Sequence, residues 1–142
     1  MTAKEYLRSL RFLDRKCDSA NEHLERLRSR IYSAKAPSLS GMPRGGETMT
    51  FEQALAKLDE LKDEWAVTVD EYVDQERLVK EQIAALEEER HRQVLSEHYI
   101  YKKTFEQIAF ETPAGYRTIC RWHGSALQEF EAVHKDFLNR EQ

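Results

Sequence analysis

The sequence predicts an all-α protein that combines a long N-terminal antiparallel helical hairpin of coiled-coil type with a small helix-turn-helix bundle. Three observations lead to this prediction. Near the N-terminus, apolar residues recur at alternating steps of four and three over more than three heptads, which is the spacing of a narrow seam between two helices. Charged residues make up 34% of the 142-residue chain, a share typical of elongated helices with large solvated faces. The Thr-x-x-Gln pattern that begins many helices occurs at Thr50 and again at Thr104.

The first predicted helix runs from Thr2 to about Ala34. Its apolar residues follow the four-three spacing without a miss. A stripe this narrow faces one partner helix, unlike the wider stripe of a helix that packs on a globular core. We therefore expect a second helix to pair along its length. The seam residues are Tyr6, Leu10, Leu13, Cys17, Ala20, Leu24, Leu27 and Ile31.

A flexible linker is predicted at residues 35–49. This stretch holds two of the three prolines and three of the five glycines in the chain, so it cannot continue the helix. Its length allows an antiparallel return of the chain. The Arg44-Gly45-Gly46 sequence lacks the lysine and the hydroxyl that a phosphate-binding loop needs, and we interpret it as part of the linker.

The second predicted helix begins at Thr50, where Thr50 and Gln53 form a capping box. Apolar residues continue at helical spacing to about Glu89. Gln75 and Glu76 interrupt this seam. A polar residue at such a place is either a register device or the exposed edge of a wider face, and the spacing leaves both open.

Charge favours pairing of these two helices. Residues 1–50 hold ten Lys/Arg against six Asp/Glu, whereas residues 51–89 hold four against thirteen. Opposite charges on the flanks steer helix pairing and orientation. Residues 1–89 are therefore predicted to form the hairpin domain. The alternative is that the acidic run binds a basic partner, although a solvated helix face is the commoner use of such a run.

A helix-turn-helix is predicted in the last third of the chain. Its first helix begins at Thr104, which can form a capping box with Gln107. Pro113 has no N–H, and Gly115 permits backbone angles that other residues resist, so both favour a break. A second helix is expected to begin near Tyr116. The residues predicted to hold the two helices at their crossing are Ile108, Ala109, Ile119, Leu127 and Phe130.

The start of this second helix carries the pattern of a DNA-reading surface. Arg117 and Arg121 lie one helical turn apart, and there is no acidic residue from Tyr116 to Gln128. An arginine fork can bond two acceptors on a guanine edge or a phosphate, and the first half of a recognition helix enters the major groove. From periodicity alone, an ordinary helical hairpin with two solvated arginines fits equally well.

A family resemblance favours the DNA-binding interpretation. This part of the chain resembles the fourth region of sigma-70-type transcription factors and the small ArpU-like or sigma-like phage regulators related to it. Pro113 stands where that family usually has the turn glycine, and Gly115 where it usually has a serine cap. The resemblance implies a sequence-specific transcription regulator encoded by a phage or prophage. The matching residues are Arg90, Val94, Leu95, Tyr99, Thr104, Glu106, Ile108, Ala109, Thr118, Ile119, Arg121, Ala126 and Leu127.

The charge of residues 90–142 limits how tightly this second domain can bind DNA alone. Residues 90–142 hold eight Lys/Arg against seven Asp/Glu, so a single copy should bind DNA weakly and with strong salt dependence. We expect a homo-oligomer or a partner protein, joined through the hairpin, to supply further affinity. The alternative function is an assembly factor whose hairpin docks a partner such as RNA polymerase. The candidate contacts to double-stranded DNA are Lys102, Lys103, Thr104, Tyr116, Arg117, Thr118 and Arg121.

Other chemistries find little support. Cys17 and Cys120 are far apart and lack both metal-ligand spacing and a neighbouring base. His91 and His98 share a helix face but have no third ligand at usable spacing. We expect no catalytic residues, no enzyme activity, no metal and no cofactor. No apolar run approaches the length of a membrane span, and we expect a cytoplasmic protein with reduced thiols.

Overall fold

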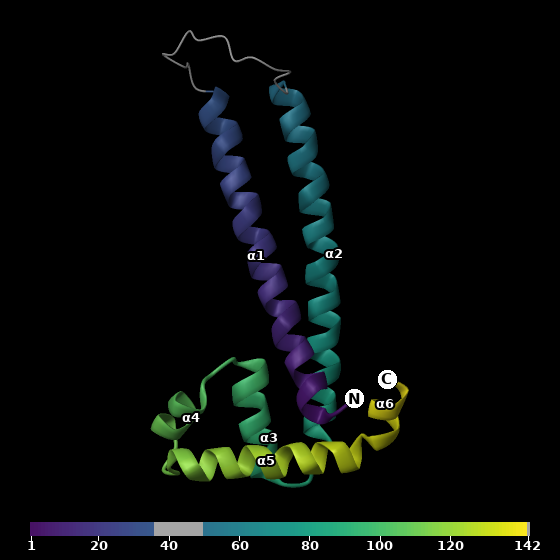
Figure 1. Cartoon of the computed structure of the whole chain (residues 1–142), viewed down its shortest axis with the longest axis vertical. Helices are drawn as coiled ribbons and strands as arrows, with labels where there is room; N and C mark the ends of the chain where they lie inside the picture. Colours follow the sequence, from purple (N-terminus) through teal and green to yellow (C-terminus); the bar gives the residue numbers. More distant parts are fainter. Residues whose placement is uncertain (36–49, 142) are drawn as a thin grey trace. The chain divides into compact units, whose positions relative to one another are not determined.

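The computed structural model describes residues 1–35 and 50–141. Within these ranges every regular element is a helix, which confirms the predicted all-α class (Figure 1). The linker predicted at residues 35–49 lies outside the described residues, apart from Lys35 at the end of the first helix. The elements are α1 (Ala3–Lys35), α2 (Phe51–Ala84), α3 (Glu89–Leu95), the π-helical turn η1 (Ser96–Ile100), α4 (Phe105–Glu111), α5 (Tyr116–Val133) and α6 (Lys135–Arg140).

The chain forms two compact units. The first unit comprises Met1–Asp14 and Tyr72–Gln142, and the second unit comprises Arg15–Glu71. The start of α1 and the end of α2 therefore belong to the same unit as the helix-turn-helix. The division into domains 1–89 and 90–142 stays a prediction.

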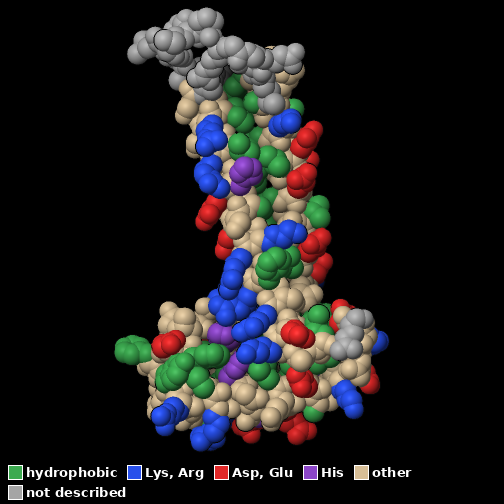
Figure 2. Space-filling view, in the orientation of Figure 1, with side chains coloured by type: hydrophobic (Ala, Val, Ile, Leu, Met, Phe, Trp, Pro, Cys, Tyr) green, Lys and Arg blue, Asp and Glu red, His purple; other side chains and the backbone are tan. Residues whose placement is uncertain are grey.

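The second unit is a pair of antiparallel helix segments. The predicted capping box at the start of α2 is present: the Gln53 amide donates to the Thr50 hydroxyl at 3.1 Å, and the Thr50 amide donates to the Gln53 side chain at 3.0 Å. Farther along, the Trp65 indole donates to the Cys17 carbonyl at 3.2 Å. Figure 2 shows apolar side chains between the two segments, with Lys and Arg mostly over α1 and Asp and Glu over α2.

The first unit has its own apolar core, to which α1 and α2 contribute alongside α5 and α6. Tyr6 of α1 lies near its centre, stacked on Phe130 at a ring-centroid distance of 6.0 Å and edge-on to Phe137 at 5.2 Å. The Tyr6 hydroxyl donates to the Gln82 side chain at 2.6 Å, so this buried polar pair is satisfied. The buried core residues are Ala3, Tyr6, Leu7, Leu10, Val79, Ile83, Leu86, Leu95, Tyr99, Ile100, Ala126, Phe130 and Leu138.

The second long helix ends earlier than the apolar spacing indicated. α2 stops at Ala84, and α3 begins at Glu89 as a separate helix. The Glu129 carboxylate of α5 accepts a hydrogen bond from the Glu87 amide at 2.8 Å, and Arg92 donates to the Glu87 carbonyl at 2.9 Å. These side chains satisfy backbone groups that a continuous helix would pair internally. The predicted extension of the helix was therefore wrong.

Candidate nucleic-acid interface

α4 and α5 form the two helices predicted for the helix-turn-helix, with the predicted starts. The Thr104 amide donates to the Gln107 side chain at 2.8 Å, and the Gln107 amide donates to the Thr104 hydroxyl at 3.2 Å. This is the predicted capping box of α4. Thr112 then closes the helix, because its hydroxyl donates to the Ile108 carbonyl at 2.9 Å. α5 begins at Tyr116.

Gly115 does not have the conformational role that the sequence suggested. It precedes α5 with φ −78° and ψ 166°, which is an extended conformation that any residue adopts. A Cβ built at Gly115 meets no atom within 4 Å. The break between α4 and α5 therefore needs no special backbone angle at Gly115, and α5 begins without a side-chain cap.

One face of α5 packs against the rest of the first unit. Ile119 is fully buried, as is Ile108 of α4, so each of the two helices turns a branched side chain into the interior of this unit. Phe130 instead belongs to the core cluster that includes α1 and α2, and Leu127 packs against that cluster. These two residues anchor the far end of α5 to the apolar core.

The start of α5 presents a different, solvent-facing surface. Arg117 and Arg121 are exposed, Tyr116 is 49% exposed, and Thr118 is half-buried. A hydrogen bond with the Cys120 thiol raises the pKa of Tyr116. Within the described residues, neither arginine forms an ion pair with a carboxylate. Both guanidinium groups are therefore free to take an external acceptor.

Three acidic side chains lie near this surface. The exposed Glu106 of α4 contributes by its charge to the raised pKa of Tyr116, whereas Glu111 and Glu129 have partners of their own. Glu111 binds Lys103 at 2.6 Å. Glu129 binds His91, and this hydrogen bond, together with the Glu87 and Glu88 amides, lowers the pKa of the Glu129 carboxyl. Both carboxylates are used in holding α3 and α4 in place.

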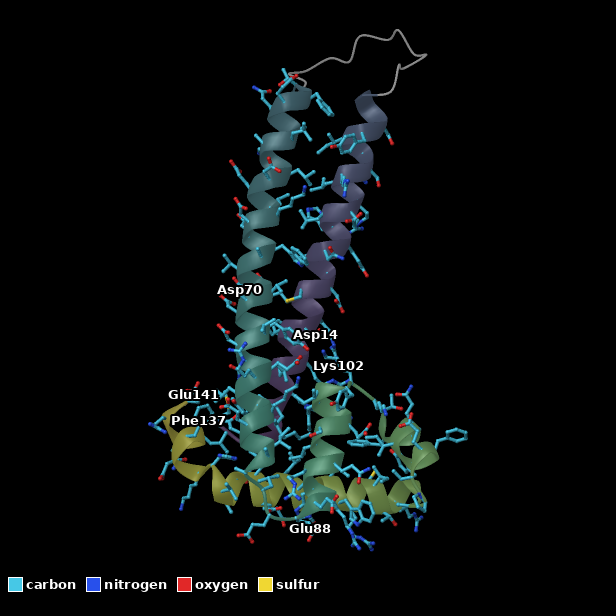
Figure 3. The ribbon with its side chains drawn as sticks, turned by 180° about the vertical axis from the view of Figure 1, so that it is seen from behind. Asp14, Asp70, Glu88, Lys102, Phe137 and Glu141 are labelled. Carbon is cyan, nitrogen blue, oxygen red and sulfur yellow. The ribbon has the colours of Figure 1, made fainter. Side chains whose placement is uncertain are left out.

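Lys102 and Lys103, the predicted phosphate contacts, also have intramolecular partners. The Lys103 ammonium lies 2.7 Å from the Glu97 carboxylate and 2.6 Å from that of Glu111. These hydrogen bonds, that of Glu111 first, raise the pKa of Lys103 to about 12. The Lys102 ammonium lies 3.0 Å from the Asp14 carboxylate (Figure 3) and donates to the Tyr72 hydroxyl. Both lysines fasten the loop before α4, and their role as phosphate contacts stays a prediction.

A packed group of buried and half-buried rings that the sequence did not predict connects this loop to α5. His98 of η1 stacks on Phe105 at a centroid distance of 4.3 Å. His123 of α5 shares a hydrogen bond of 2.8 Å with the Tyr99 hydroxyl. Burial lowers the pKa of His98, and it lowers the pKa of His123 to about 4. Both rings are therefore neutral near pH 7 and serve in packing and hydrogen bonding.

Arg11 of α1 joins this group from outside the helix-turn-helix. Its guanidinium donates to Nε2 of His98 at 3.1 Å, and Nδ1 of His98 donates to the Lys103 carbonyl at 2.8 Å. Sequence reasoning missed the connection because no local pattern relates Arg11 to residues near position 100. The start of α1 is thereby a structural neighbour of the candidate interface.

Two kinds of feature are absent from the described residues. In the described part of the chain, no three His, Cys, Asp or Glu side chains come close enough together to hold a metal ion. Of the helices that the structure describes, none combines the length and the apolar character that a membrane crossing needs. Comparisons with protein-family models, with curated proteins and with solved structures find no match for this chain.

Proposed function

We propose that the protein is a sequence-specific DNA-binding transcription regulator that acts in the cytoplasm and reads the major groove with the start of α5. One observation carries the proposal. Arg117 and Arg121 are exposed on the outer face of the second helix of a two-helix crossing, with no carboxylate partner among the described residues. Arginine forks in this position match the paired acceptors of a guanine edge.

The neighbouring residues support the same use of α5. Tyr116 and Thr118 offer hydroxyls beside the arginines, and α5 has no acid before Glu129 to repel a phosphate backbone. The Thr104 capping box and the carboxylate partners of Lys102 and Lys103 hold α4 and its loop, which positions α5. The resemblance to sigma-like phage regulators agrees with this proposal and would make the gene one of phage or prophage origin.

The test uses duplexes selected from a randomised library with the full-length protein. Each arginine that reads a base contributes about 1–3 kcal/mol of discrimination, so Arg117→Ala with Arg121→Ala should remove most of the preference for the selected duplex over an unrelated one. Arg15→Ala with Arg77→Ala is the matched control, since both are exposed arginines of the long helices without a described ion pair. If the double variant keeps the full preference, α5 is not the reading helix.

The hairpin supports a second part of the proposal, pairing of two copies. Among the described residues of the second unit, the buried apolar side chains are Cys17 and Leu24 of the α1 seam and Leu58 of α2, while Leu27 and Ile31 are half-buried. A two-fold pair would cover the remaining apolar surface and set the basic α1 segment of one copy against the acidic α2 segment of the other. Multi-angle light scattering across a concentration series tests this. A dimer should also select inverted half-sites one helical turn apart, whereas a monomer selects a single site.

One observation favours the alternative function, an assembly factor whose helical hairpin docks a protein such as RNA polymerase and whose helix-turn-helix serves as a protein-binding surface. The Phe110 side chain at the end of α4 is 93% exposed and the nearby Tyr116 is 49% exposed. Exposed aromatic side chains of this kind are enriched at protein–protein contacts. Feeble binding of the full-length protein to every selected and unselected duplex, together with capture of purified polymerase that Phe110→Ser weakens, would favour this alternative.

A further inference from the structure

The start of α1 carries a row of basic side chains. Lys4, Arg8 and Arg11 follow one another at steps of four and three residues, which places them on one stripe of the helix. Lys4 and Arg8 are exposed, and Arg11 is half-buried against His98. Among the described residues, none of the three forms an ion pair.

The nearby acids do not neutralise this row. Asp14 binds Lys102, and Glu97 binds Lys103. The Glu5 carboxylate instead accepts a hydrogen bond from the Thr2 amide at 2.8 Å, at the beginning of α1. Asp14 and Glu97 are thus balanced by lysines. The Glu131 carboxylate accepts from the Ala3 amide at 3.0 Å, and among the described residues neither Glu5 nor Glu131 forms an ion pair with a member of the row.

The positive charge of the row affects the pKa values of two histidines in the first unit. Besides burial, the charges of Lys4 and Arg8 lower the pKa of His123, and those of Arg11 and Arg8 lower the pKa of His98. Figure 2 shows Lys and Arg side chains gathered over the start of α1 beside histidines, and more of them at the end of the first unit where α5 begins. Both groups are visible on the same face of this unit.

We propose that Lys4, Arg8 and Arg11 form a phosphate-binding surface that contacts the sugar-phosphate backbone of duplex DNA beside the bases read by α5. This inference rests on the proposed function. The row spans about 10 Å of helix axis, which matches the rise of about three nucleotides of one strand. Guanidinium and ammonium groups are the usual donors to phosphate oxygens. Since Lys102 and Lys103 already have carboxylate partners, α1 supplies the uncompensated charge that backbone binding needs.

The test replaces the two exposed members of the row and leaves Arg11, which holds His98, in place. Lys4→Gln with Arg8→Gln is compared with Lys16→Gln with Arg26→Gln, which removes the same charge from exposed positions of α1 in the second unit. Anisotropy is measured at several salt concentrations with the full-length protein, on the selected duplex and on an unrelated duplex of equal length. Thermal unfolding midpoints verify that both variants fold.

Loss of two phosphate contacts should lower the slope of log affinity against log salt by about 1.8, so that a fourfold rise in salt weakens binding about 12-fold less than for the natural chain. Affinity should fall equally on both duplexes, because backbone contacts carry no sequence information. The control variant should keep the natural slope.

Two outcomes would overturn the inference in distinguishable ways. If the natural chain prefers its selected duplex and the two double variants have equal slopes, the α1 surface is wrong while the reading function stands. If the natural chain binds neither duplex, both the proposed function and the proposed phosphate-binding surface on α1 are wrong.

Discussion

The Arg11 guanidinium donates to Nε2 of His98 at 3.1 Å, and this contact fixes the tautomer of the ring. Arginine can only donate, so Nε2 carries no proton and Nδ1 carries the one that it donates to the Lys103 carbonyl at 2.8 Å. A neutral His98 therefore connects α1 to the loop that leads into α4. The position of the helix-turn-helix depends on this ring as well as on its own two helices.

Replacing His98 should show this dependence. His98→Ala removes two hydrogen bonds and the stack on Phe105, and we expect a loss of about 2–4 kcal/mol in the free energy of unfolding. Urea denaturation measures the loss. His23→Ala, at an exposed position of the second unit, should change the free energy by less than about 0.5 kcal/mol. Equal effects of the two substitutions would contradict the structural role of His98.

Stability should fall as the solution becomes acidic, mainly through His123. The folded-state pKa of His123 is about 4, below the ordinary value of 6.5, because the ring is buried with only 9% of its surface exposed. In the unfolded chain His123 therefore binds a proton below about pH 6.5, whereas in the folded chain it binds one only below about pH 4. The stabilising contribution is complete above the upper value and is lost as the pH falls to the lower one. The loss amounts to about 3 kcal/mol.

Urea denaturation at a series of pH values between these limits measures the effect. The His98 pKa is lowered as well, so its contribution has the same sign. His123→Gln keeps a hydrogen-bonding group for the Tyr99 hydroxyl but does not titrate, and it should flatten most of the dependence. A natural chain whose stability is constant over this range would show that His123 is not held neutral by the fold.

Structural features that depend on residues close together in the sequence could be predicted. Features that depend on side chains far away in the sequence could not. The starts of α2 and α4 follow from Thr-x-x-Gln pairs three residues apart, and the structure confirms both. The stop at Ala84 depends on the Glu129 carboxylate, which reaches the Glu87 amide from 42 residues farther along the chain. The apolar spacing along α2 gives no indication of that contact.

The same distinction applies to the candidate interface. The exposure of Arg117 and Arg121 follows from their places on an amphipathic helix, so the spacing predicted which side chains face outward. From the sequence, the Lys102 side chain was expected to be equally available to a DNA phosphate. Its carboxylate partner, Asp14, lies 88 positions earlier, and only the packing of α1 beside the loop brings the two together.

A serine at the start of α5 should stabilise the protein. The backbone at Gly115 is already extended, with open space where a Cβ would lie. In Gly115→Ser the hydroxyl can accept from the Thr118 amide, which has no helical partner in the first turn. We expect a gain of about 0.3–1 kcal/mol in the free energy of unfolding. Gly115→Ala adds the Cβ without the hydroxyl acceptor. Comparing the two variants therefore separates the effect of helix capping from the effect of a less flexible unfolded chain. A destabilised serine variant would mean that the turn needs glycine after all.

Lys102 offers a direct comparison between a structural lysine and a phosphate-binding lysine. Its ammonium is balanced by Asp14 and contacts the hydroxyl and the ring of Tyr72, contacts that a glutamine at this position would lose. Lys102→Gln should therefore lower the free energy of unfolding, which urea denaturation measures. The salt slope of DNA binding should stay unchanged, because an ammonium already paired with a carboxylate displaces few counterions. Lys4→Gln with Arg8→Gln should do the reverse, lowering the slope with little loss of stability. If Lys102→Gln instead lowers the slope by about 0.9, the lysine leaves Asp14 on binding and contacts phosphate, as its place before α4 had suggested.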